Sequence, residues 1–269
     1  MSPVNPTGDT TTLTITAGTA LNPTQTSPVT IKAVSIADPT YSYGSFKAVV
    51  KPRLDGNLTM YKITESVRNL TPSSVPTAMS LQNYLNNIAW GKQANVFFTV
   101  TAGSPVALSV HYDLLPAPNG NGMLDDFQAS FGSVESAAIA QAILAVNPTN
   151  GTLANTIVSY VNKFGPPGSV SCTPAPGVTC RFIEGETMDG THISYVEDPQ
   201  DSDSNSRENI TAHEVGHGID SNIGDIRAPR RENKSLMWAG RNSNNGDPAN
   251  PCEIRDREWR LANPTPGDQ

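Results

Sequence analysis

One stretch organises the rest of this 269-residue chain: Asn209-Ile-Thr-Ala-His-Glu-Val-Gly-His-Gly-Ile-Asp220. Residues four apart on a helix lie on the same face, so His213 and His217 would project side by side and could bind one Zn²⁺. Glu214 follows the first histidine directly and would lie beside the metal, where it could take a proton from a metal-activated water. The pattern predicts a zinc helix with Glu214 as the catalytic base. The alternative is a chance pair of histidines on a surface helix.

The composition narrows the classes of protein and partner. The formal net charge is −7, only 16% of residues are charged, and there is no dense run of Lys or Arg. These features argue against nucleic acid and anionic membranes as partners. No apolar run approaches the length of a membrane span. The abundance of Thr, Ser, Asn, Pro and Gly is typical of a loop-rich, β-containing protein, and we expect an extracellular or cell-envelope location.

The cysteines and the N-terminus bear on the same expectation. Cys172 and Cys180 flank the turn-rich segment Thr-Pro-Ala-Pro-Gly-Val-Thr, which predicts a loop-closing disulfide, with Cys252 left over. The alternative is three reduced thiols. Residues 1–8 lack the basic and apolar layout of a signal peptide. We therefore expect either that a targeting segment has been removed or that the protein is not secreted.

Residues 1–57 are predicted to form a small β-rich N-terminal segment. Apolar and polar residues alternate over 12–16 and 29–36, and a third short β-like stretch covers 46–51 after a Gly-containing turn. A β-sandwich-like module, a pro-segment and extra strands of the main sheet are all compatible with this pattern. The main domain is predicted over 58–269.

Predicted strands and predicted helices alternate along the main domain. Strands are predicted at 58–67, 95–100, 107–112, 156–164 and 191–196, and helices after Thr77 and at 133–146. The first helix carries an apolar stripe, with Gly91 expected just after its end, at C′: Leu81, Tyr84, Leu85 and Ile88. This order predicts an α+β fold, a mixed twisted sheet with helices packed on it.

A second metal was considered at Asn119-Gly-Asn-Gly-Met-Leu-Asp-Asp126, which resembles part of a calcium-binding loop. Ala117 stands where such a loop requires an acidic residue, and Gln128 stands at the bidentate Glu position. A tight Asn-Gly turn is therefore the favoured interpretation. Ca²⁺ is kept as the alternative.

Downstream of the zinc helix, Ser235-Leu-Met-Trp238 resembles the Met-turn of the metzincins, zinc endopeptidases that carry a His-Glu-x-x-His helix. The resemblance implies that Met237 lies beneath the metal as a hydrophobic floor. The closing residues 250–259 resemble the helix that follows the Met-turn. The resemblance covers roughly residues 58–262, but only the zinc helix and the Met-turn are specific. It implies a metzincin-like fold.

The chain departs from the metzincin pattern after the second histidine. That pattern has Gly three residues later and a third ligand three residues beyond it, but this chain has Asp220 and Ile223 there, and no later His. On a continuing helix Asp220 would lie about 10 Å along the axis from the first histidine. Asp225 follows Gly224, which permits a sharp turn back toward the metal. Asp225 is thus the expected third ligand, and Asp220 is expected to end the helix in the left-handed conformation.

A gluzincin-type site is the alternative for the third ligand. It would take a downstream Glu on a helix, and Glu232, Glu253 and Glu258 are available, although none of them has a setting that recommends it.

The predicted function is zinc-dependent hydrolysis of peptide bonds by a metalloendopeptidase acting on peptide or protein substrates. The resemblance implies that an extended substrate pairs with the strand over 192–196. The alternatives are a catalytically inactive metzincin-like binding or surface protein and a β-rich structural protein with an incidental His pair. Cysteine-based latency is not expected, because no Cys precedes Cys172. Oligomeric state and substrate preference do not follow from the sequence.

Overall fold

The structure is a computed structural model of the whole chain. It describes residues 29–35, 37–38, 40, 42–48, 52–66, 69, 71–72, 75–108, 132–148, 152–162, 185–188, 191–197, 207–220, 222–223, 236–237, 254 and 256–263. These residues fall into two compact units that divide after Pro52. Each unit is described by itself.

The first unit contains an antiparallel hairpin of β1 (Val29–Val34) and β2 (Ser42–Ala48). In the connection, the Asp38 carboxylate accepts a hydrogen bond from the backbone N–H of Thr40 at 3.0 Å, an Asx-type turn. The strand predicted at 29–36 is confirmed within these bounds. The strand predicted at 12–16 lies outside the described residues.

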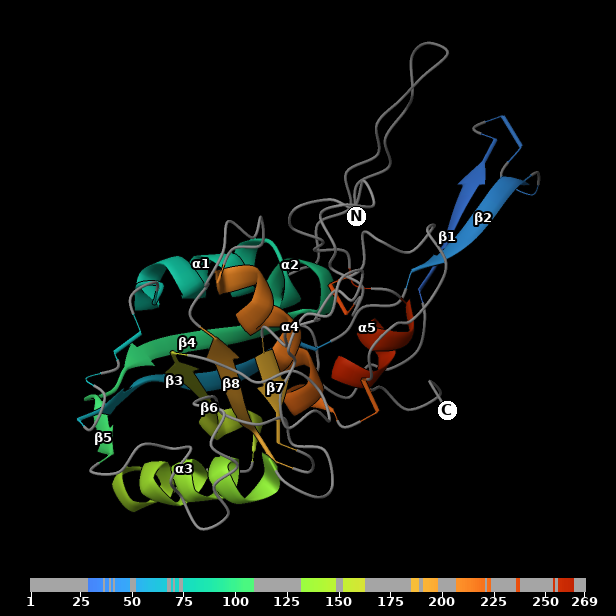
Figure 1. Ribbon diagram of the computed structural model, residues 1–269. Coiled ribbons are helices and arrows are strands. Elements are labelled where there is room, and N and C mark those ends of the chain that lie inside the picture. The colour runs from blue at the N-terminus through green and yellow to red at the C-terminus, as the bar shows by residue number, and fades with distance from the viewer. Residues whose placement is uncertain are drawn as a thin grey trace, which may run out of the picture. The chain divides into compact units, whose positions relative to one another are not determined.

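The second unit is built on a mixed six-stranded sheet (Figure 1). Its strands are β3 (Leu54–Glu65), β4 (Val96–Ala102), β5 (Val106–Leu108), β6 (Thr156–Val161), β7 (Gly185–Thr187) and β8 (Ile193–Glu197). The order across the sheet is β4-β3-β6-β8-β7. Strand β5 pairs with residues 63–65 of β3, after the part of β3 that pairs with β4. All pairs are parallel except β7 with β8. The α+β prediction is therefore confirmed at the level of a mixed sheet with packed helices.

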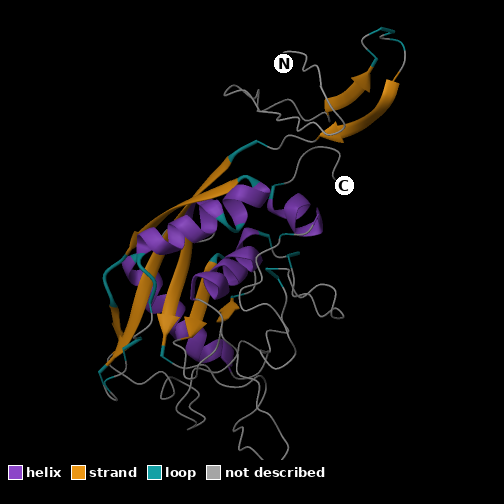
Figure 2. Cartoon of the chain, turned by 90° about the horizontal axis from the view of Figure 1, so that it is seen from above, coloured by secondary structure: helices purple, strands orange, loops and turns teal. Residues whose placement is uncertain are grey.

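Helices cover both faces of this sheet. On one face lie α1 (Ala78–Asn87), α2 (Trp90–Ala94) and α4 (Arg207–Ile219); α3 (Gly132–Val146) lies on the other (Figures 1 and 2). A hydrophobic core lies on each face of the sheet, the first under α1, α2 and α4 and the second under α3. Side chains alternate along β3, so Leu58 and Met60 lie in the first core while Tyr61 and Ile63 lie in the second. The first core continues into α4, which places the predicted histidine helix directly on the sheet.

The end of the first predicted helix needs a correction. Helix α1 begins after Thr77, as predicted, and the Thr77 hydroxyl caps it by accepting from the Ser80 N–H at 3.0 Å. The helix ends at Asn87. Gly91 is therefore not a C′ glycine; it lies inside α2. A Cβ at this position would lie 2.2 Å from the Asn86 carbonyl oxygen, so the glycine permits a close approach between the two helices.

Two further elements complete the unit. A short 3-10 turn, Leu153–Asn155, leads into β6. Helix α5 (Asp256–Ala262) packs against α2, and the Asn263 side-chain amide donates to the Ala94 carbonyl at 3.0 Å. The helix expected over 250–259 is therefore found at Asp256–Ala262.

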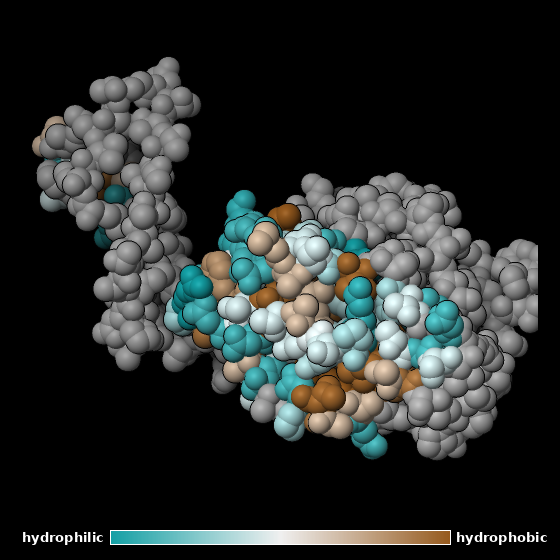
Figure 3. All heavy atoms as spheres, turned by 90° about the vertical axis from the view of Figure 1, so that its left-hand side faces the viewer, coloured by the Kyte–Doolittle hydropathy of each residue, from teal (hydrophilic) through white to brown (hydrophobic). Residues whose placement is uncertain are grey.

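The helices of the described residues were compared with the length and apolarity that a membrane span requires. No helix there is long and apolar enough to cross a bilayer. On the face drawn in Figure 3, apolar side chains form small areas separated by polar ones. The large apolar side chains that are exposed among the described residues are Val34, Met79, Ile88 and Val146.

Candidate metal centre

Helix α4 carries the histidine pair and is buried around most of its circumference. Glu208 in its first turn complements the positive end of the helix dipole. Trp90 is fully buried beneath the helix, and its indole N–H donates to the Ala212 carbonyl at 2.8 Å. Tyr160 on β6 contacts the Thr211 hydroxyl at 2.9 Å, and burial raises the pKa of this tyrosine. The helix is therefore attached to α2 and to β6 of the sheet.

The two imidazoles meet at their Nε2 atoms. His213 Nε2 and His217 Nε2 are 3.2 Å apart, and the rings are nearly perpendicular. His213 Nδ1 lies 2.7 Å from the carbonyl oxygen of Leu236, and His217 Nδ1 lies 2.6 Å from that of Ile223. A carbonyl only accepts hydrogen bonds, so each Nδ1 carries the proton. In the neutral rings, each Nε2 then turns a lone pair toward the other.

This arrangement fits a metal ion. Two lone pairs at 3.2 Å repel each other unless a proton or a cation lies between them. Tetrahedral zinc with Zn–N bonds of about 2.0–2.1 Å holds two nitrogens about 3.3 Å apart. In metal sites, a histidine ligand is usually oriented by a hydrogen bond from its other ring nitrogen. Here the Nδ1 atoms make such hydrogen bonds to the two carbonyls. His213, Glu214 and His217 together could hold a metal, with their ligand atoms all within 4.8 Å of one another.

Glu214 lies beside the pair and is almost completely buried. Its Oε1 atom is 3.9 Å from His213 Nε2. Its Oε2 atom accepts from the hydroxyl of Thr187 on β7 at 3.1 Å, and the same hydroxyl donates to the Glu214 backbone carbonyl at 2.7 Å. One carboxylate oxygen is thus bound to β7, while the other faces the histidines.

Met237 lies against the helix on which both histidines stand. It is fully buried, and a Cβ at Gly216 would lie 2.6 Å from its Sδ atom and 2.6 Å from Cζ2 of Trp90. Gly216 stands between the two histidines in the sequence, so the methionine packs where a side chain at 216 would otherwise lie. The neighbouring Leu236 carbonyl holds His213. The expected position of Met237 beneath the pair is compatible with these contacts.

The third ligand predicted from sequence, Asp225, lies outside the described residues, as do Glu232 and Glu253. Asp220 and Glu258 are described, and neither belongs to the cluster around the histidines. Asp220 follows the last residue of α4, and its Oδ1 accepts from the Asn222 N–H at 2.7 Å. It therefore ends the helix through an Asx turn. The expected left-handed conformation is wrong, since the non-glycine residues described with positive φ are Asn69 and Asn95.

The predicted substrate edge also needs a correction. Strand β8 lies between β6 and β7, so residues 192–196 are not at an edge of the sheet. Among the described strands, the outer one on this side is β7, which has only three residues and no periodic pattern to reveal it. At the opposite side the N–H and carbonyl of Phe98 on β4 bind the Asn86 side chain, and the Val100 N–H binds Gln82. Helix α1 thus covers the backbone of β4.

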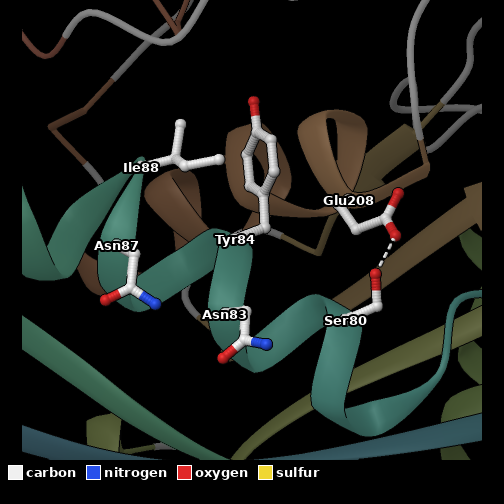
Figure 4. A pocket seen from close by; sticks show the side chains of 6 residues that line it. All are labelled: Ser80, Asn83, Tyr84, Asn87, Ile88 and Glu208. Atoms are coloured by element: carbon white, nitrogen blue, oxygen red, sulfur yellow. Dashed lines mark hydrogen bonds between the residues drawn. The ribbon is translucent and has the colours of Figure 1, made fainter.

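A pocket of about 460 Å³ elsewhere on α4 does not include the histidines (Figure 4). It is lined by Ser80, Asn83, Tyr84, Asn87, Ile88 and Glu208. The Ser80 hydroxyl donates to Glu208 at 2.5 Å, and the Asn209 amide donates to the Tyr84 hydroxyl at 2.7 Å. These hydrogen bonds attach the first turn of α4 to α1. The pocket therefore lies where the two helices contact each other.

Three other predictions concern residues outside the described ranges. The proposed Cys172–Cys180 disulfide, Cys252 and the calcium-like loop 119–126 all lie outside the described residues. A scan against protein-family models finds no match, and a search of curated proteins finds no significant match.

Proposed function

We propose that this chain is a zinc-dependent metalloendopeptidase with a metzincin-like catalytic domain. The observation that carries the proposal is the pair of Nε2 atoms of His213 and His217, 3.2 Å apart, in two rings that are each fixed by a carbonyl at Nδ1. A buried glutamate lies next to the first histidine, and Met237 packs beneath the helix. These contacts support the resemblance to metzincins that the sequence alone suggests.

The residues divide the work of peptide hydrolysis. When bound, zinc would supply a Lewis acid that polarises the scissile carbonyl and lowers the pKa of water. His213 and His217 would hold it, with Asp225 proposed as the third ligand. Glu214 accepts the proton of the attacking water at Oε1, the oxygen that faces the histidines. As the C–N bond breaks, the same oxygen returns that proton to the leaving amine.

Substrate binding is proposed along β7. An extended peptide can add a strand to an exposed sheet edge, where main-chain hydrogen bonds give affinity without demanding one sequence. β7 is the outer strand beside Glu214, whereas α1 covers the backbone of β4 at the opposite edge. This placement would bring the middle of a peptide to the general base and suits cleavage within a chain.

Zinc content and peptidase activity test the proposal together. The protein is stripped with a chelator, reloaded with Zn²⁺ and assayed for metal by elemental analysis and for cleavage of a denatured protein substrate. We expect one zinc per chain, lost in His213→Ala, and cleavage by the wild type. Glu214→Gln should keep the zinc and lose activity by about 10²- to 10⁴-fold. Full activity of zinc-loaded Glu214→Gln would remove Glu214 from its role.

The same experiment separates the rival functions. Stoichiometric zinc without any cleavage would favour an inactive metzincin-like binding protein. No stoichiometric metal, with stability unchanged by chelator, would favour an incidental His pair. Asp225→Ala decides the third ligand, because a ligand variant loses zinc while an outer residue keeps it.

A further inference from the structure

The hydroxyl of Thr187 connects β7 to the general base. Its Oγ1 atom lies 2.7 Å from the backbone oxygen of Glu214, 3.1 Å from Oε2 of the same residue, and 2.9 Å from the hydroxyl of Ser194. Thr187 and Ser194 are paired across β7 and β8, and Ser194 is fully buried. Three polar groups from two elements, α4 and β8, therefore converge on one hydroxyl.

Proton accounting gives this arrangement a direction. A threonine hydroxyl has one proton to donate and can also accept. The Glu214 backbone oxygen at 2.7 Å and the Oε2 atom at 3.1 Å are both acceptors, so they share the single Thr187 proton. The contact with Ser194 is then satisfied by the Ser194 proton. The chain of donation runs from Ser194 to Thr187 to Glu214, and it presents the carboxylate with a donor.

Gly185 explains how the Glu214 side chain fits against the strand. A Cβ at Gly185 would lie 2.7 Å from Cγ of Glu214 and 2.9 Å from Oε1. Glu214 is 4% exposed, so its side chain has little free space in other directions. Within one short strand, Gly185 leaves room for the side chain and Thr187 binds its end.

We propose that Thr187 is a positioning residue for Glu214, with Gly185 as its steric complement. This inference rests on the proposed function and names the element that orients its general base. By binding Oε2, Thr187 leaves Oε1 directed toward His213 Nε2, 3.9 Å away. The hydroxyl acts through Glu214, which is the residue of the proposed site that it contacts.

Thr187→Val tests the role, because valine keeps the shape of threonine and removes the hydroxyl. A displacement of about 1 Å at a catalytic group can cost 100-fold in rate, so we expect kcat to fall about 10- to 100-fold. KM and zinc content should stay near the wild-type values. Thr187→Ser, which retains a hydroxyl, should recover most of kcat. If valine prevents folding, Thr187→Ala makes the same test.

Thr191→Val is the matched control. Its hydroxyl donates to the Met188 carbonyl at 2.7 Å and accepts from the Ile193 N–H at 3.1 Å, in the turn between β7 and β8. The Thr191→Val substitution therefore removes a hydroxyl from the same hairpin and leaves the contacts of Glu214 unchanged. Equal losses of kcat in Thr187→Val and Thr191→Val would mean that only hairpin stability matters, and would overturn the proposal.

A second readout requires neither metal nor substrate. Unfolding of the metal-free protein is measured for the wild type, Thr187→Val, Glu214→Ala and the double variant. Glu214→Ala keeps the backbone oxygen and removes the carboxylate, so the cycle isolates the contact with Oε2. We expect Thr187→Val to cost less stability in the Glu214→Ala background. Equal costs in both backgrounds would show that no such coupling exists.

The outcomes keep the two proposals distinct. An active wild type with unchanged kcat in Thr187→Val overturns the positioning role alone. A zinc-loaded wild type that cleaves no peptide overturns both the function and the positioning role.

Discussion

The Nδ1 atom of His217 lies 2.6 Å from the carbonyl oxygen of Ile223. Ile223 occupies the position at which the metzincin pattern has its third ligand, and its side chain cannot bind zinc. That side chain is buried in the core beneath α4, while its carbonyl fixes the ring of a proposed ligand. The departure from the pattern therefore leaves this residue supporting the site through its backbone.

Asp220 should affect zinc through the turn that presents Ile223. Its carboxylate binds the backbone and side-chain amides of Asn222, and its backbone oxygen accepts from the Ile223 N–H at 2.9 Å. Asp220→Ala removes the side-chain bonds and should weaken zinc binding about 10- to 100-fold, as loss of outer-shell support does. Competition with a chelator of known affinity measures the change.

Asp220→Asn is the control for this prediction. Asparagine keeps an oxygen that can accept the same two hydrogen bonds. Zinc affinity should therefore stay close to that of the wild type. Equal, severe losses in both variants would instead identify Asp220 as a ligand.

Gly216→Ala should destabilise the fold, although alanine favours helices. The new methyl group would lie 2.6 Å from both Met237 and Trp90, and Trp90 is held by its hydrogen bond to Ala212. Overpacking of this kind costs about 1–3 kcal/mol. Denaturant unfolding of the metal-free protein measures the loss.

Gly218→Ala on the same helix is the matched control. A Cβ there would have no neighbour nearer than 3.7 Å, which is ordinary van der Waals contact. The helix propensity of alanine should then leave stability unchanged or raise it by up to about 1 kcal/mol. Similar losses for the two variants would mean that the packing of Met237 is not the cause.

Asn86→Ala should expose the edge of the sheet at β4. The Asn86 amide binds both the N–H and the carbonyl of Phe98, at 2.8 and 2.9 Å, in the manner of a neighbouring strand. Removing one partner of a buried hydrogen bond costs about 1–3 kcal/mol. The open edge should also promote aggregation, which light scattering detects. Asn83→Ala, at an exposed position of the same helix, should stay within about 0.5 kcal/mol of the wild type.

The sequence predicts the parts of this fold whose signal is periodic. The stripe containing Leu81 and Leu85 marks α1, and both residues are fully buried. The helix predicted at 133–146 corresponds to α3, and the His-Glu-x-x-His spacing places both histidines on one face of α4. For α1 and α4 a local repeat is enough, because residues three and four apart fall on one face of a helix.

The parts that escape prediction depend on contacts between distant segments. The role of Thr187 arises from a residue 27 positions away, and β7 is too short to show alternation. Gly91 resembles a helix terminator in sequence, but it is required by the approach of Asn86. The strand over 193–197 is predicted correctly, yet its place inside the sheet follows only from its pairing with β7. Periodicity identifies elements, whereas pairing decides which of them forms an edge.

Tyr195 should make the protein sensitive to alkaline pH. It is fully buried on the face of the sheet opposite α4, and burial, followed by the charge of Glu186, raises the pKa of its phenol. Below about pH 10 the phenol is neutral in both the folded and the unfolded chain, so this group adds no pH dependence. Above about pH 10 the unfolded chain loses the proton while the folded chain keeps it, which favours unfolding. Stability should fall by about 1.4 kcal/mol per pH unit from this residue. Tyr195→Phe removes the group and should make the curve of unfolding free energy less steep between pH 10 and 11, while the buried phenol of Tyr160 still contributes to the slope. Parallel curves for the two proteins would contradict the assignment.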